Sequence, residues 1–124
     1  MVTGSCLCGG IAFELRGALR DVVQCHCGQC RRTSGHVWAA TRVSDAQLTF
    51  TSDETLTWYH SSSEAKRGFC NRCGASVFWR HKDDDGPAVS AGSLNSPTGL
   101  KTAKHIYTKD KGDYYLIAED GPIL

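Results

Sequence analysis

The sequence of 124 residues has no long hydrophobic run and almost no net charge. No apolar stretch approaches the roughly 18 residues that a membrane-spanning helix needs, so no membrane segment is predicted. The 14 Lys and Arg against 13 Asp and Glu leave a formal charge of +1, which argues against a nucleic-acid partner. The first residues also lack the basic and apolar regions of a signal peptide, so we expect a cytoplasmic protein.

Sustained helical periodicity is also missing, and short strand patterns dominate instead. One short helix is expected after Cys30, capped by Thr33 or Ser34. The dipeptides Gly9-Gly10 and Asp85-Gly86 predict hairpins. Strands are expected in the ranges 11–15, 22–27, 37–43, 56–60, 75–81, 88–94 and 105–108. We therefore expect a mostly β fold of short strands, in a single zinc-binding domain over residues 1–124.

Cysteine is abundant for a chain of this kind, with seven residues, an odd number that excludes full pairing in disulfides. In a reducing compartment, close-set cysteines more often bind metal or perform chemistry. They form three clusters: Cys6-Leu7-Cys8-Gly9-Gly10, Cys25-His26-Cys27-Gly28-Gln29-Cys30 and Cys70-Asn71-Arg72-Cys73-Gly74.

The spacing favours a division of these cysteines into four and three. Cys6 and Cys8 share one face if they lie on a strand that bends at the following glycines, and Cys70-x-x-Cys73 is a knuckle spacing. Together they could close a structural site. The remaining three, Cys25, Cys27 and Cys30, would leave one position for water or substrate, as in catalytic zinc sites. The residues alone leave open two alternatives: a site formed by the first two clusters, Cys6/Cys8 with Cys25/Cys27, and free buried cysteines or a transient disulfide.

These three motifs, in this order, resemble the glutathione-dependent formaldehyde-activating enzyme family, which also includes centromere protein V. The stretches Ala91–Leu94 and His105–Tyr107 are similar as well, and the likeness extends from about Gly4 to Ile117. The resemblance implies coiled antiparallel sheets, as in Rab-binding accessory proteins, and two zinc ions. It assigns the structural site to Cys6, Cys8, Cys70 and Cys73 and the open site to Cys25, Cys27 and Cys30. Asn95-Ser96-Pro97 and Asp113-Tyr114-Tyr115 depart from the family pattern and concern the substrate.

The family's founding activity is the condensation of formaldehyde with glutathione to S-hydroxymethylglutathione, a carbon–sulfur lyase reaction. The resemblance thus implies a small-molecule thiol and an aldehyde as partners, with Cys25, Cys27 and Cys30 as the catalytic set. Arg31 and Arg32 are candidates for binding substrate carboxylates, since arginine forms bidentate pairs with them. His26 is expected to support the site from the core, whereas His36, His60 and His105 are possible fourth ligands or bases. The alternative is a non-catalytic, zinc-stabilised binding module. The sequence gives no indication of an oligomeric state.

Overall fold

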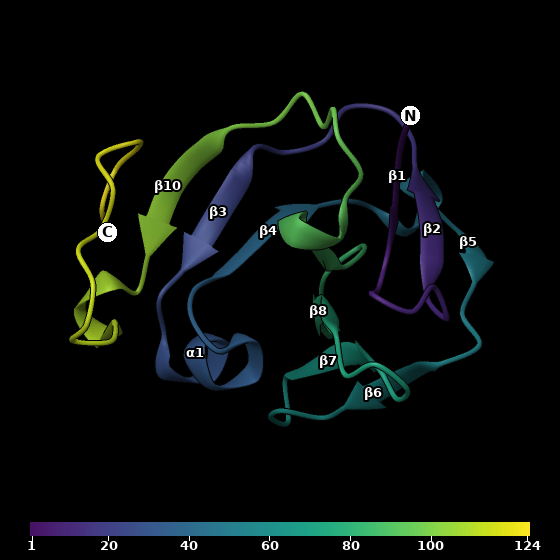
Figure 1. Cartoon of the computed structure of the whole chain (residues 1–124), viewed down its shortest axis with the longest axis horizontal. Helices are drawn as coiled ribbons and strands as arrows, with labels where there is room; N and C mark the ends of the chain where they lie inside the picture. Colours follow the sequence, from purple (N-terminus) through teal and green to yellow (C-terminus); the bar gives the residue numbers. More distant parts are fainter.

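The computed structural model describes residues 1–124 and consists mainly of strands in two sheets. The smaller sheet has the order β1-β2-β5, with bounds β1 (Val2–Ser5), β2 (Ala12–Leu15) and β5 (Leu48–Ser52). The larger has the order β10-β3-β4-β9-β8-β7-β6, with bounds β10 (Thr102–Ile106), β3 (Val22–Cys25), β4 (Trp38–Arg42), β9 (Ala88–Ser90), β8 (Ser76–His81), β7 (Ala65–Cys70) and β6 (Leu56–Tyr59). Figure 1 shows β10, β3 and β4 on one side of the molecule and the smaller sheet on the other.

The mostly β prediction is confirmed, but the sheets are not purely antiparallel. The edge strand β10 runs parallel to β3, with Ile106 opposite Cys25. Every other strand pair is antiparallel. The long connection after β9 carries the chain across to β3, which makes a parallel approach possible where a tight hairpin would enforce an antiparallel one. The larger sheet is therefore mixed.

Both predicted hairpins form. The β1–β2 hairpin turns through Gly9, whose φ of 83° is left-handed, and through Gly10, where a Cβ atom would lie 2.3 Å from the Thr55 hydroxyl. The β8–β9 hairpin contains Asp85-Gly86. One expectation is wrong in detail: Cys6 and Cys8 lie in the turn itself and not on a strand, because β1 ends at Ser5.

The predicted short helix exists but begins earlier than expected. Helix α1 (Gly28–Ser34) has Cys27 as its N-cap, and the Cys27 sulfur accepts a hydrogen bond from the Cys30 N–H at 3.3 Å. Thr33 and Ser34 lie at its C-terminal end and are not caps at its start. The other helical segments are single 3₁₀ turns, η1 (Asp45–Gln47), η2 (Ala91–Ser93) and η3 (Thr108–Asp110). None of these helices has the length and apolarity that a membrane crossing requires.

The hydrophobic core lies between the two sheets and includes cysteines of only one set. Its members are Cys6, Ile11, Phe13, Leu15, Val43, Cys70, Val77, Phe78, Val89 and Leu94. A second, smaller cluster contains Cys30, Trp38 and Ala40, where α1 packs against β4. The first and third cysteine motifs are thus built into the main core, whereas the second motif belongs to a separate small one.

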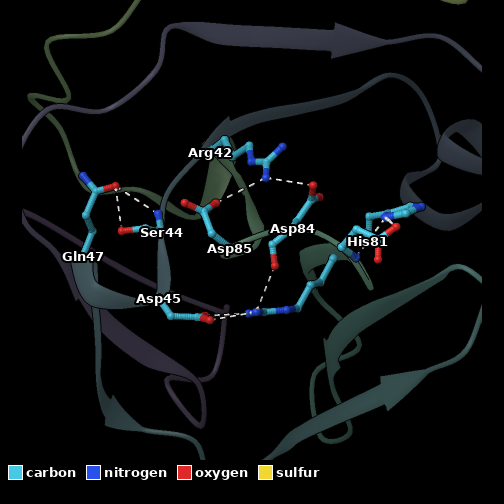
Figure 2. A network of polar contacts seen from close by, with 9 residues as sticks. Arg42, Ser44, Asp45, Gln47, His81, Asp84 and Asp85 are labelled. Atoms are coloured by element: carbon cyan, nitrogen blue, oxygen red, sulfur yellow. Dashed lines mark hydrogen bonds and ion pairs between the residues drawn. The ribbon is translucent and has the colours of Figure 1, made fainter.

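Surface ion pairs join the last residue of β4 and the segment that follows it to the β8–β9 hairpin (Figure 2). Arg80 donates to both carboxylate oxygens of Asp45, at 2.5 and 2.7 Å, and Arg42 lies 2.9 Å from Asp84. The hydrogen bond from Arg80 lowers the pKa of the Asp45 carboxyl. Exposed pairs of this kind stabilise a fold by at most about 1 kcal/mol each, so they order the turn and contribute little to global stability.

Candidate metal centres and active site

Four cysteine sulfurs meet where the β1–β2 turn approaches the end of β7. The Sγ atoms of Cys6, Cys8, Cys70 and Cys73 all lie within 4.8 Å of one another. Cys8 Sγ is 3.7 Å from Cys6 Sγ and 3.5 Å from Cys70 Sγ. Metal–sulfur bonds of about 2.3 Å in a tetrahedron separate sulfurs by roughly 3.8 Å, so the four sulfurs fit one ion. This grouping is the one that the resemblance implied.

The chain around these sulfurs supplies donors suited to thiolates. Cys70 Sγ accepts from the N–H groups of Arg72 and Cys73 at 3.4 and 3.3 Å, and the Thr55 hydroxyl lies 3.0 Å away. Burial by itself raises the pKa of the Cys70 thiol, but these hydrogen bonds outweigh it and bring the pKa to about 5. The Arg72 Nε also donates to Cys8 Sγ at 3.3 Å. A site with four sulfurs and no free position is of the closed, structural type.

The other three cysteines form a local cluster at the junction of β3 and α1. Cys25 ends β3, Cys27 caps α1 and Cys30 lies in its first turn, which brings their Sγ atoms within 4.8 Å of one another. The helical turn folds the chain back on itself, so residues close in sequence converge without help from a distant strand. Neither this set nor the set of four includes a histidine, so His36, His60 and His105 join no cluster as a further ligand.

A buried arginine reaches this cluster from β7. Arg67 Nη2 donates to Cys30 Sγ at 3.5 Å, and Arg67 Nε donates to Gln29 Oε1 at 2.8 Å. The hydrogen bond with Cys25, reinforced by Arg67, lowers the pKa of the Cys30 thiol to about 6, whereas that same bond and burial raise the pKa of Cys25. Negative charge in the cluster is therefore favoured on Cys30.

A cavity of about 420 Å³ opens beside the three sulfurs and is lined by Cys25, Cys27 and Cys30. The rest of its wall is apolar or aromatic, including Trp38, except for the side chains Arg20, Gln29 and Arg67. No cysteine of the four-sulfur cluster lines this cavity. Of the two clusters, the three-sulfur cluster is therefore the one that adjoins this cavity.

Arg31 and Arg32 lie in the last part of α1, outside the residues that line this cavity. Arg32 is exposed, and Arg31 is half-buried with an Nε that has no acceptor among the protein's atoms. Their role in binding substrate stays a prediction. The two arginines that do line the cavity, Arg20 and Arg67, come from distant segments. No spacing in the sequence links Arg67, which lies on β7, to Cys30.

The sequence as a whole matches a known family. The model of the glutathione-dependent formaldehyde-activating enzyme family matches residues 1–110. The chain belongs to this family. A protein named as an uncharacterized lyase from Schizosaccharomyces pombe is 25% identical over 117 residues, which cover 90% of this chain and 82% of that protein. The crystal structure of a Rhodobacter sphaeroides protein, 27% identical, superposes with a TM-score of 0.63 over 76% of this chain and 88% of that one.

Membership of the formaldehyde-activating family and the name of the yeast relative support a lyase-like enzyme. The two cysteine clusters could each bind a metal, which agrees with the family's association with zinc. In this family member the four-sulfur cluster is part of the main core and the three-sulfur cluster adjoins a cavity. The two clusters thus differ in position as well as in the number of sulfurs.

In this formaldehyde-activating family member, His26 belongs to a chain of hydrogen bonds that joins two buried histidines, His26 and His105, to half-buried Tyr115 and exposed Asp120. Its Nδ1 lies 2.5 Å from the Tyr115 hydroxyl and its Nε2 lies 2.9 Å from His105 Nδ1. His105 Nε2 in turn lies 2.5 Å from an Asp120 carboxylate oxygen. A carboxylate only accepts, so His105 Nε2 donates a hydrogen bond to Asp120. His105 Nδ1 then accepts a hydrogen bond from His26 Nε2, and His26 Nδ1 accepts one from the Tyr115 hydroxyl. His26 is therefore a buried, hydrogen-bonded core residue, and its support of the site stays a prediction.

This network should contribute measurably to stability. Replacing His105 with phenylalanine is expected to lower the free energy of unfolding by about 1–3 kcal/mol, because the His26 N–H would be left buried without an acceptor. Urea unfolding measures the change, and His60→Phe, at an exposed histidine, is the control. The hydrogen bond from His105 lowers the pKa of the Asp120 carboxyl. The stabilisation that this hydrogen bond contributes is therefore present at neutral pH, and it is lost as the pH falls through the lowered pKa of Asp120. Equal stability of both variants would contradict this role.

Proposed function

We propose that the chain is a zinc-dependent carbon–sulfur lyase-like enzyme that joins a small thiol to an aldehyde, with glutathione and formaldehyde as the pair and S-hydroxymethylglutathione as the product. The observation that carries this proposal is the cavity beside Cys25, Cys27 and Cys30. Three protein ligands leave a coordination position for a substrate, and here that position would face a cavity. We further propose two zinc ions per chain, one structural and one at this open site, in a cytoplasmic protein.

The residues of the open site have distinct tasks in this reaction. Cys25, Cys27 and Cys30 would hold the ion, which when bound acts as a Lewis acid and lowers the pKa of a thiol. The apolar wall around Trp38 would exclude water that competes for the aldehyde. The thiolate sulfur attacks the carbonyl carbon, a carbon–sulfur bond forms, and the carbonyl π electrons move to the oxygen, which then takes up a proton.

Arg31 and Arg32 remain our proposed contacts for the carboxylates of glutathione. They follow Cys30 directly on α1, so a peptide-like thiol whose sulfur lies at the cluster could extend along the helix toward them. Cysteamine has a thiol but no carboxylate. Its affinity should therefore be independent of both arginines.

The direct test measures exchange between formaldehyde and a thiol by NMR, which resolves catalysed exchange from the appreciable uncatalysed addition. Zinc-loaded wild-type protein should accelerate exchange with glutathione and with cysteamine. The double variant Arg31→Ala/Arg32→Ala should raise KM for glutathione by about tenfold or more, as expected for the loss of charge-assisted hydrogen bonds, and leave cysteamine unaffected. If the protein carries two zinc ions and accelerates exchange with no thiol, the chain is instead a zinc-stabilised binding module.

A further inference from the structure

Arg67 presents a buried hydrogen-bond donor that no other part of the protein uses. The residue is 6% exposed, and of its three guanidinium nitrogens Nε and Nη2 have partners within the protein. Nη1 is buried and has no acceptor among the protein's atoms. A buried charged group without a full set of acceptors is costly and rare, and the Arg67 side chain lines the cavity, so this arginine points to a ligand.

The guanidinium is also held in a fixed place. Its Nε is bound by Gln29 at 2.8 Å, its Nη2 contacts Cys30 Sγ at 3.5 Å, and its Cζ lies 5.5 Å from the centre of the Trp38 ring. Arg20, the other arginine of the cavity, differs because its Nη2 and Nε donate to the backbone carbonyls of Ala40 and Asp21. Arg67 is therefore the cation of this cavity that is both fixed and incompletely satisfied.

We propose that the Arg67 guanidinium binds the oxygen of the small carbonyl compound that enters the cavity and stabilises the negative charge that develops on it. This inference rests on the proposed function and adds a catalytic residue to it. The contact with Cys30 places the guanidinium beside the reacting centre, whereas a remote substrate carboxylate would lie farther from the sulfurs. As the thiolate attacks, the new carbon–sulfur bond forms and the carbonyl electrons move to the oxygen, which accepts a hydrogen bond from the guanidinium until solvent protonates it. Arginine stays protonated throughout.

The apolar wall of the cavity strengthens this role. Its wall is mostly apolar, so a single fixed donor acts in a low-dielectric setting where it is worth more than in water. The site suits small, planar oxygen compounds with a carbonyl or carboxylate group. Formate fits this description, is not consumed in the proposed reaction and serves as a probe of binding alone.

The experiment compares wild type, Arg67→Met, Arg67→Lys and the charge-loss control Arg16→Met. Arg16 is an exposed arginine directly after β2, and its side chain pairs only with Glu14. Metal content is measured first, and all rates are expressed per metal-loaded chain. Arg67→Met should lower the rate constant for thiol–formaldehyde exchange by about 100- to 1,000-fold, as for loss of one oxyanion donor, and weaken formate binding at least about tenfold. Arg67→Lys should fall between, since an ammonium is a point charge without the planar fork. Arg16→Met should match wild type.

Two further outcomes separate this inference from the proposed function. If wild type binds formate in an Arg67-dependent way but accelerates no exchange, the proposed function fails and the oxygen-binding site stands. If wild type catalyses exchange and metal-loaded Arg67→Met does so at the same rate with the same formate affinity, the role of Arg67 is overturned. Should the methionine variant fold poorly, Arg67→Ala tested with added guanidinium replaces it: recovery of exchange supports the role, and folded, metal-loaded protein without an activity loss refutes it.

Discussion

Replacing Cys70 with serine is expected to leave a chain that does not reach the native fold. Cys70 is fully buried in the main core, and its sulfur lies 3.5 Å from that of Cys8. Loss of this ligand would open the four-sulfur site and remove the tie between the β1–β2 turn and β7. Structural zinc contributes on the order of 10 kcal/mol in small peptides, which is comparable to the whole stability of a domain.

Circular dichroism, solubility and elemental analysis measure this effect. The control is Leu7→Ser, which lies between Cys6 and Cys8 in the β1–β2 turn and is 90% exposed; this variant should fold and keep close to two zinc ions. A Cys70→Ser protein that melts at the wild-type temperature would show that the four sulfurs hold no structural metal.

The second large effect is expected on activity and not on folding. Cys30→Ser should retain the circular dichroism spectrum of the wild type and the zinc of the four-sulfur site. It should lose the zinc of the three-sulfur site and with it thiol–formaldehyde exchange, by at least about 100-fold, more than residues that merely support a ligand. The physical reason is position: Cys30 belongs to the small cluster with Trp38 and Ala40, outside the main core.

A matched control for this variant lies on the same helix. Thr33 is exposed and lines a different hollow, so Thr33→Ala should keep both metals and full activity.

The metal of the three-sulfur cluster should leave before that of the four-sulfur cluster when a chelator is added, because it has fewer protein bonds and adjoins a cavity. Release of both metals in one step together with unfolding would contradict the division into a structural and an open site.

Local patterns predicted most of the strands but not how they pair. Ranges rich in β-branched and aromatic residues became β3, β4, β6 and β8, and the two turn dipeptides gave their hairpins. The strand β7 was missed because Lys66 and Arg67 interrupt its apolar pattern, although Arg67 is in fact buried. The parallel pairing of β10 with β3 depends on a long connection, and no local signal specifies where such a connection ends.

The same contrast applies to the candidate site. Ligand grouping was readable only in part: cysteine spacing favoured the division into four and three that the structure shows, but it left open a site formed by the first two clusters, and the family resemblance chose between them. The cavity was not readable, because Arg20, Arg67 and Trp38 come from three separate segments. The supporting chain from His26 to Asp120 was also invisible, since it joins residues 79 positions apart in one of its steps and only the folded sheet edge brings them together.

The position of the cysteines along the chain also sets an order of events during synthesis. Five of the seven cysteines are made before Cys70 exists, and the stretch 25–30 can close around an ion as soon as it emerges. Cys8 must wait for a partner 62 positions later, a closure with a larger entropic cost and a slower approach. If the clusters bind metal as proposed, a growing chain that meets free metal would therefore fill the three-sulfur cluster first. Until β7 has been made, the only other cysteines available to Cys6 and Cys8 are those of the three-sulfur cluster. An ion shared by Cys6, Cys8 and that cluster would tie the first hairpin to the wrong sheet.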